Sequence, residues 1–327
     1  MRLEAGLPAR FCVRFAVACA LLYCMLELTP DSLYFPLNRL NTVLAAKLLD
    51  MLGFAVQSRG LLIAFEGFQA QVIGECSAVF LSVLPVAFIW AYPTAMRARL
   101  IGWIVGMVLL FIVNLIRIDL LVLTDARASR FFEPVHLYGA QVVMILTVLA
   151  ICLGWVGWQR GDWSAKRFGA VVLRFVLISV IAFAGWWLFS GPYIGLMYRT
   201  IHFGLAWLDI PVDVPVSLRV YPDTFKCFNW VTFSALAWSF GDEPYKMRIR
   251  FWLQGLVLLS GLHALFTLLQ VLFIEYPRLW LVGVINLVLV LNEWVLPFGM
   301  WLVHKRKALT ASPPDGMQKG PIPPLPA

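Results

Sequence analysis

Several uninterrupted apolar runs, each close to the length of a membrane-crossing helix, constrain the fold of this chain more than any other feature. A helix needs ~20 predominantly apolar residues to cross the hydrocarbon core of a bilayer. The chain is 61% apolar and 13% charged, whereas a soluble domain is about half apolar and about one quarter charged. We therefore predict an all-α polytopic membrane protein. The clearest candidate spans are residues 11–28, 76–92, 100–123, 136–157, 169–190, 251–274 and 280–303.

Basic residues predict the orientation of these spans. They cluster in short loops beside the apolar runs, which is the positive-inside pattern of cytoplasmic loops, so the net charge of +8 does not indicate nucleic-acid binding. Seven spans would leave the last two clusters outside. An eighth crossing through the short run 227–240 places every cluster inside, so we predict about eight transmembrane helices with both termini in the cytoplasm. The clusters are Arg97 and Arg99; Arg160, Lys166 and Arg167; Lys246, Arg248 and Arg250; and Lys305, Arg306 and Lys307.

The two ends of the chain differ in composition from the spans. The first 28 residues carry Arg2, Arg10 and Arg14 ahead of a longer apolar stretch, as in a signal peptide, but no small-x-small cleavage site follows, so we interpret this segment as a retained anchor. Residues 306–327 are rich in proline and are predicted to form a disordered cytoplasmic tail. The six cysteines have neither zinc-site nor disulfide spacing, and no metal or cofactor is implied.

The order of elements predicts a degenerate tandem repeat of two four-helix domains, residues 1–160 and 161–305. Each half contains a span, an outer amphipathic helix, an outer β-prone hairpin, a cysteine, a short span, a Met-Arg-x-Arg sequence and two further spans. Two unrelated four-helix units that obey the same topology rules remain the alternative. The outer segments are 39–56 and 57–74 in the first half, and 193–209 and 210–226 in the second.

Cys76 begins the second predicted span, directly after a polar outer segment. A helix N-terminus stabilises a thiolate over a thiol, and its free N–H groups can bind an oxyanion. The polar neighbours Glu75 and Ser77 favour a functional role, whereas the other cysteines inside apolar runs are expected to behave as small hydrophobic residues. Cys227 occupies the corresponding place in the second half, but no arginine or histidine follows it as in the first half, so the second half is predicted to be inactive.

Arg117 and His136 lie near the same outer face by this topology. Arg117 lies ~9 Å below the outer end of its span by helix rise, with Asn114 on the same helical face, and a mid-span arginine costs at least ~2.5 kcal/mol. His136 opens the next span, and its ordinary pKa of about 6.5 suits a general base. Snorkelling of the arginine and capping by the histidine are the structural alternatives. Together the three residues predict a cysteine acyl-transfer site: a nucleophilic thiolate, a base, and a cation that stabilises the oxyanion.

The sequences Glu75-Cys76-Ser77-Ala78 and Asn114-Leu115-Ile116-Arg117-Ile118, followed by His136 at a helix start, resemble the exosortase/archaeosortase family over residues 10–160. The compact first half looks most like exosortase H, and the second half is similar to an associated membrane domain. The resemblance implies a membrane cysteine transpeptidase that cleaves C-terminal sorting signals, each a short motif, a transmembrane helix and a basic tail. It also implies Cys76, Arg117 and His136 as catalytic residues at the periplasmic face of a bacterial inner membrane. The family often has glycine where Ala78 stands.

The substrate motif, the acceptor (a lipid amine or water) and the role of the second half are not predicted by the sequence. The outer hairpin could hold the substrate motif by strand addition, in which case deletion of Leu61–Phe65 should impair cleavage. A non-catalytic scaffold or assembly factor for surface-protein or exopolysaccharide export is the main alternative function. A transporter is a weaker one, because the repeats run in parallel and the polar groups gather at one face.

Overall fold

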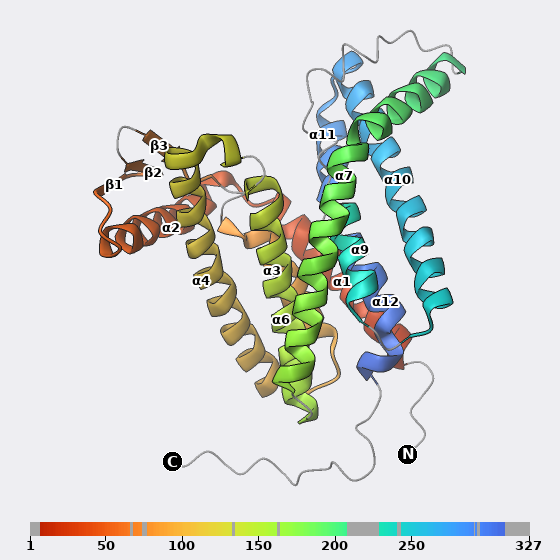
Figure 1. The fold of residues 1–327 in the computed structure, drawn as a ribbon, viewed down its shortest axis with the longest axis horizontal. Coiled ribbons are helices and arrows are strands. Elements are labelled where there is room, and N and C mark those ends of the chain that lie inside the picture. The colour runs from red at the N-terminus through yellow and green to blue at the C-terminus, as the bar shows by residue number, and fades with distance from the viewer. Residues whose placement is uncertain are drawn as a thin grey trace. The chain divides into compact units, whose positions relative to one another are not determined.

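The computed structural model describes residues 7–65, 68–73, 77–132, 135–161, 164–207, 229–240, 243–290, 292 and 295–310 (Figure 1). Within these residues, five helices are long and apolar enough to cross a membrane, and two shorter apolar helices span Val79–Ala91 and Trp280–Leu289. The predicted all-α polytopic membrane fold is confirmed. The count of eight spans stays a prediction.

The chain divides into two compact units. The first comprises residues 1–168 and 305–327, and the second comprises residues 169–304. The helices of the first unit are α1 (Leu7–Glu27), α2 (Asp31–Met51), α3 (Val79–Ala91), α4 (Met96–Ala128) and α6 (Ala140–Arg160), with short turns η2 (Ser129–Phe131) and η3 (Val135–Gly139) between α4 and α6.

The core of the first unit forms around α3. The α1 helix packs along α3 through edge-to-face contacts of Phe11 with Phe88 and with Tyr92. Both α4 and α6 also contact α3. Eight of the 13 residues of α3 are buried, which explains why this helix carries an almost continuous apolar sequence rather than an amphipathic one.

A three-stranded sheet follows α2, as predicted for the outer segment of the first half. Strands β1 (Val56–Arg59), β2 (Leu62–Phe65) and β3 (Phe68–Gln71) pair antiparallel in the order β1-β2-β3, so β2 is central. Figure 1 shows the sheet beside α2 and the end of α4. The guanidinium of Arg127 on α4 lies 4.8 Å from the ring centroid of Phe54 and 5.6 Å from that of Phe65. These cation–π contacts stabilise the packing of the sheet on α4.

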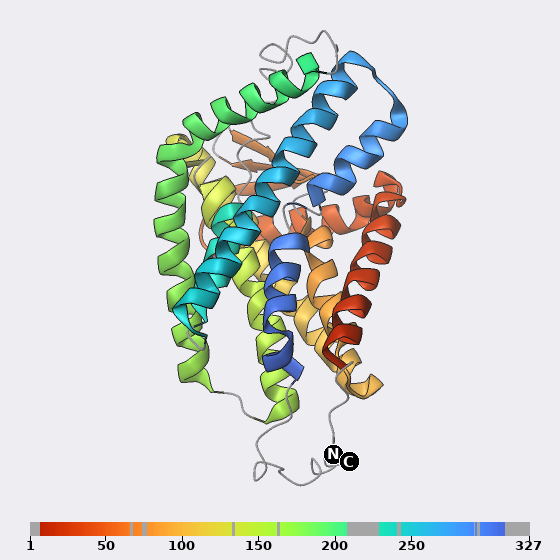
Figure 2. The same cartoon turned by 90° about the vertical axis from the view of Figure 1, so that its right-hand side faces the viewer.

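The second unit contains α7 (Ala165–Trp207), α9 (Asn229–Ser239), α10 (Tyr245–Glu275), α11 (Leu279–Val290) and α12 (Leu296–Thr310); α7 and α12 cross the unit boundaries along the chain. The predicted span 169–190 and most of the predicted outer helix 193–209 lie on one helix, α7, which continues through Pro192 to residue 207. The carboxyl-terminal part of α7 packs on α10 through Met197, Ile201, Leu205 and Val271 (Figure 2). The predicted span 280–303 is divided into α11 and α12. The predicted β-prone segment 210–226, Cys227 and the proline-rich tail beyond residue 310 lie outside the described residues.

An arginine, two tryptophans and a hydrogen-bond acceptor join α3 to α4, and a corresponding set of four residues joins α9 to α10. In the first unit, Arg99 lies 5.2 Å from the ring centroid of Trp90, and Trp103 stacks on Trp90 and donates a hydrogen bond to the carbonyl of Val86. In the second unit, Arg248 lies 5.4 Å from the ring centroid of Trp238, and Trp252 packs on Trp238 and donates to Oγ of Ser234. Each residue of the second set lies 148 or 149 positions after its counterpart. This correspondence supports the hypothesis of a degenerate repeat.

Candidate active site

The start of α3 is marked by a left-handed residue. Ala78, which caps α3, has φ 56° and ψ 13°, and it is the one non-glycine residue with positive φ in the described part of the chain. Ser77 beside it is buried. The helix proper begins at Val79, three residues after Cys76. Cys76 and Glu75 lie outside the described residues, so their predicted roles stay predictions.

Arg117 is fixed on α4 by its neighbour one turn earlier. Its Nη1 donates a hydrogen bond of 3.2 Å to Oδ1 of Asn114, whose side chain is fully buried. The pairing of these two residues, expected from their shared helical face, is therefore present. The distance below the helix end was underestimated, because α4 continues to Ala128 rather than ending near residue 123. By helix rise, Arg117 lies ~17 Å from that end.

His136 lies in the π-helical turn η3 and is half buried. Its ring stacks on Phe132, with centroids 5.3 Å apart and an angle of 27° between the ring planes. Burial lowers the pKa of His136 below its ordinary value of 6.5, and the positive charge of Arg117 lowers this pKa further. The η3 turn contacts α4, and the influence of Arg117 on the pKa of His136 indicates that the two side chains lie within electrostatic range of each other.

The lowered pKa suits the predicted role of His136. The imidazole is neutral at physiological pH and can accept a proton. Arg117 remains charged under all relevant conditions and can stabilise an oxyanion that forms beside it. Glu133, which could orient the imidazole, lies outside the described residues. Within the described residues, no three His, Cys, Asp or Glu side chains lie close enough together to hold a metal ion.

Sequence reasoning missed a set of buried polar residues near this pair. Asp119 on α4 is 4% exposed, and neither carboxylate oxygen has a hydrogen-bond partner among the described residues. On α2, Asn38, Asn41 and Thr42 are also buried. The apolar residues that predicted this helix, which include Leu40 and Val43, lie on a different face of α2 from the buried polar residues. The missed signal was the recurrence of small and polar residues at helical spacing: Asn38, Asn41, Thr42 and Ala45.

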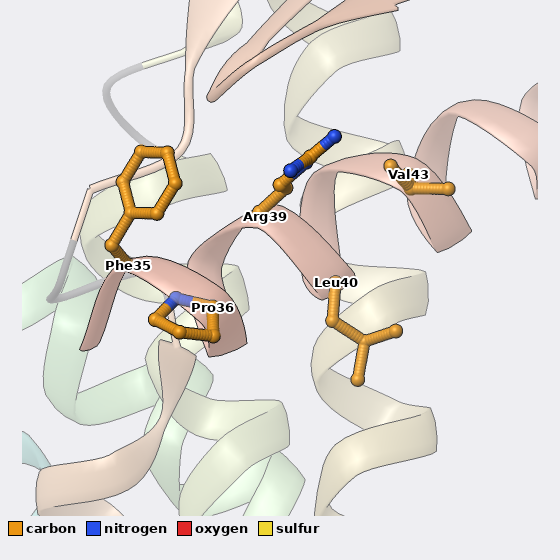
Figure 3. Close-up of a pocket in the computed structure, with 5 residues that line it drawn as sticks. All are labelled: Phe35, Pro36, Arg39, Leu40 and Val43. Carbon is orange, nitrogen blue, oxygen red and sulfur yellow. The ribbon is translucent and has the colours of Figure 1, made fainter. Parts of the chain in front are cut away.

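An open hollow of about 350 Å³ lies on that other face of α2. Figure 3 shows its lining, which is apolar except for one guanidinium: Phe35, Pro36, Arg39, Leu40 and Val43. Leu40 is 47% exposed, whereas Asn41 beside it in sequence is fully buried. The hollow therefore belongs to the outward surface of α2 and is separate from the buried polar residues.

Comparison with known protein families matches residues 4–149 to the family described as transmembrane exosortase (Exosortase_EpsH). The matched region contains Asn114, Arg117 and His136, and it ends within α6. The family resemblance recognised from the sequence is therefore confirmed for the first half of the chain. No curated protein and no solved structure matches the chain.

Proposed function

We propose that the protein, whose residues 4–149 match the family described as transmembrane exosortase, is a membrane cysteine transpeptidase that cleaves C-terminal sorting signals of exported proteins. The observation that carries this proposal is the contact of η3, the turn that holds His136, with α4, the helix that holds Arg117. It brings a permanent cation and a neutral imidazole together within the matched region, and both follow the cysteine-bearing segment in the chain.

The reaction proceeds through a thioester. His136 accepts the proton of the Cys76 thiol, and the thiolate attacks the carbonyl carbon of the scissile peptide bond. Arg117, oriented by Asn114, stabilises the negative charge on the carbonyl oxygen. The carbon–nitrogen bond then breaks as His136 returns the proton to the leaving amine. An acceptor, either a lipid amine or water, attacks the thioester carbonyl and releases Cys76 as a thiol.

The substrate is a protein tail made of a short motif, a transmembrane helix and a basic end. We expect that helix to dock laterally among the spans, with its motif at the periplasmic face of a bacterial inner membrane. Both termini of the enzyme are then cytoplasmic, as the basic clusters predict.

The outer sheet limits how the motif can bind by strand addition. Strand β2 is paired on both sides, so only the edges of β1 and β3 can accept another strand. Deletion of Leu61–Phe65 would remove the central strand and dismantle the whole sheet. That deletion is therefore not a specific test of docking, contrary to the expectation from the sequence.

Trapping of the thioester tests the function. Wild type, Cys76→Ala and the matched cysteine variant Cys227→Ala are incubated in nanodiscs with a synthetic tail containing all three parts of a sorting signal. We expect mass spectrometry to show an acyl adduct or a cleaved tail for wild type and Cys227→Ala, and neither for Cys76→Ala. Equal cleavage by all three proteins would remove Cys76 as the nucleophile. The absence of any adduct across a panel of tails would favour a scaffold.

A further inference from the structure

Two buried amide side chains on α2 lack the partners that buried polar groups normally have. Asn38 is 5% exposed and Asn41 is fully buried. Oδ1 of Asn38 and both Oδ1 and Nδ2 of Asn41 make no hydrogen bond to any described residue. An unsatisfied buried polar group costs about 1–3 kcal/mol, so such groups are rare in folded proteins unless a ligand or water completes them.

The position of α2 is fixed on both sides of these amides. Before them, the hydroxyl of Tyr34 donates a 2.7 Å hydrogen bond to the carbonyl of Leu26, and its ring centroid lies 6.4 Å from that of Phe80 in the first turn of α3. Beyond them, Ala45 and Leu49 pack in one apolar cluster with Ile118 of α4. Thus α2 extends from the start of α3 to the segment of α4 that carries Arg117.

Asn38 and Asn41 occupy the interval between these two anchors. Asn38 lies one helical turn after Tyr34, and Asn41 lies one turn before Ala45, on the same buried face. Ile118 adjoins Arg117 in sequence. The two amides therefore lie along α2 between its contact with the first turn of α3 and its contact with the segment of α4 that carries Arg117. Under the proposed function, the reacting carbonyl is held between the segment that precedes α3 and this arginine.

A carboxamide offers a donor and an acceptor in one plane, as a peptide bond does. It can therefore pair with the N–H and C=O groups of an extended peptide without reading its side chains. A neighbouring residue supports this assignment by contrast. Thr42 is equally buried on the same face, but its hydroxyl already donates to the carbonyl of Asn38 and is satisfied within the helix.

We propose that Asn41, assisted by Asn38, binds the main chain of the extended substrate motif beside the bond to be cleaved. This inference rests on the proposed function and adds a substrate-binding subsite to it. The ligand is a stretch of peptide backbone, so Asn41 contributes affinity and orientation. The side chains of the motif are recognised elsewhere.

Binding of the tail peptide to a protein that cannot turn it over tests the subsite. Asn41→Leu, which is nearly isosteric, is introduced into Cys76→Ala in nanodiscs, and affinity for a fluorescent tail peptide is measured. We expect about tenfold weaker binding, from the loss of hydrogen bonds worth about 1.5 kcal/mol, with an unchanged or higher melting temperature. Thr42→Val is the matched control and should bind the peptide normally.

A depsipeptide series adds a test that needs no stable variant. Each probe replaces one N–H of the motif with an ester oxygen, and the probe that removes the bond to Asn41 should bind weakly to Cys76→Ala. That loss should disappear in Asn41→Leu, as a double-mutant cycle requires. Equal peptide affinity with and without Asn41, no weakened depsipeptide, or no binding to Cys76→Ala overturns the subsite. If binding depends on Asn41 but wild type forms no thioester, the subsite stands and the proposed chemistry fails.

Discussion

Ala78 adopts a backbone conformation that costs an L-residue about 1–2 kcal/mol and costs glycine almost nothing. The chain makes this turn between Cys76 and the first turn of α3. A φ of 56° is a conformation that glycine adopts at little cost, so glycine would fit this place without strain. Compared with glycine, alanine loses less backbone entropy on folding, but its backbone is strained in this turn.

Replacement of Ala78 by glycine should relieve this strain. We expect Ala78→Gly to raise the free energy of unfolding by about 0.5–1 kcal/mol, since the relief exceeds the entropic cost of glycine. The measurement is thermal or denaturant unfolding in detergent. Ala87→Gly in the middle of α3 is the control and should lose about 1 kcal/mol or more. A melting temperature of Ala78→Gly at or below that of wild type would contradict the strain.

The pH response of His136 should report the charge of Arg117. A positive charge nearby disfavours a second one, so it lowers the pKa of His136. Arg117→Gln removes the charge but leaves the burial, and the pKa of His136 should therefore rise while staying below 6.5. The acid limit of any residual activity should move to higher pH by the same shift.

Histidine NMR in nanodiscs measures this pKa directly, with the signal assigned by comparison with His136→Gln. Arg127→Gln removes an equal charge from the same helix at a guanidinium that stacks on Phe54, and it should leave the pKa of His136 unchanged. An unaltered pKa in Arg117→Gln would show that the arginine does not act on the imidazole.

The residues of the site differ in how far the sequence revealed them. Arg117 and His136 were predicted to meet because the membrane confines their helices to one orientation, and a charge or imidazole is conspicuous within an apolar run. Asn41 was not predicted, because the apolar pattern of its helix, which includes Leu40 and Val43, indicates a different face as the buried one. Only the fold shows that its polar face is the buried one.

At the scale of elements, close packing of α4 on α6 depends on two glycines one turn apart. A Cβ atom added to Gly102 would overlap the indole of Trp155, and one added to Gly106 would lie 2.9 Å from Cγ2 of Ile151. Trp155 also donates a 3.4 Å hydrogen bond to the carbonyl of Ala98. Small residues spaced in this way allow membrane helices to approach closely, and here they bring together the helix of Arg117 and the helix that follows His136.

Gly102→Ala should push these helices apart. We expect a loss of about 1–3 kcal/mol, the usual penalty for overpacking, measured by unfolding in mixed detergent. Gly169→Ala, where no atom lies within 4 Å of the added methyl group, should be neutral or slightly stabilising. Equal stability of Gly102→Ala and wild type would show that the α4–α6 interface yields easily.

Helix boundaries were the least predictable part of the fold. The predicted outer helix 39–56 begins at Asp31 and ends at Met51, and it runs through Pro36. Likewise α7 continues through Pro192 to residue 207. A proline removes one hydrogen bond from a helix, but packing of the surrounding turns can outweigh that loss, and sequence alone does not show the packing.

At the scale of the whole molecule, the two units place different side chains at corresponding positions of related helices. His263 lies 149 positions after Asn114, and both side chains are buried. In the second unit His263 accepts or donates hydrogen bonds with Tyr193 and Asn229, and Asn229 also donates to Asn292. Phe266 stands 149 positions after Arg117, so the second unit has an aromatic ring in place of the cation. This difference supports the prediction that the second half is inactive.

The general architecture could be predicted because the membrane permits few folds. Apolar runs were enough to predict an all-α, multi-spanning chain, and the β-prone segment 57–74 predicted the small sheet after α2. The buried network around His263 was not predicted, since the sequence shows this histidine only among apolar neighbours. Its hydrogen-bond partners, Tyr193 and Asn229, come from α7 and α9, two helices that only tertiary structure brings to α10.

The short length of α3 fixes the depth of the turn that precedes it. Its 13 residues rise ~20 Å, against a hydrocarbon core of ~30 Å. Because α3 is buried among longer helices, the level of the turn before it is set by the protein and not by the thickness of the surrounding lipid. Under the proposed function, a substrate tail anchored by its basic end at the cytoplasmic face is cleaved at the depth that the length of α3 sets. Tails would then be sorted by the length of their helix as well as by their motif.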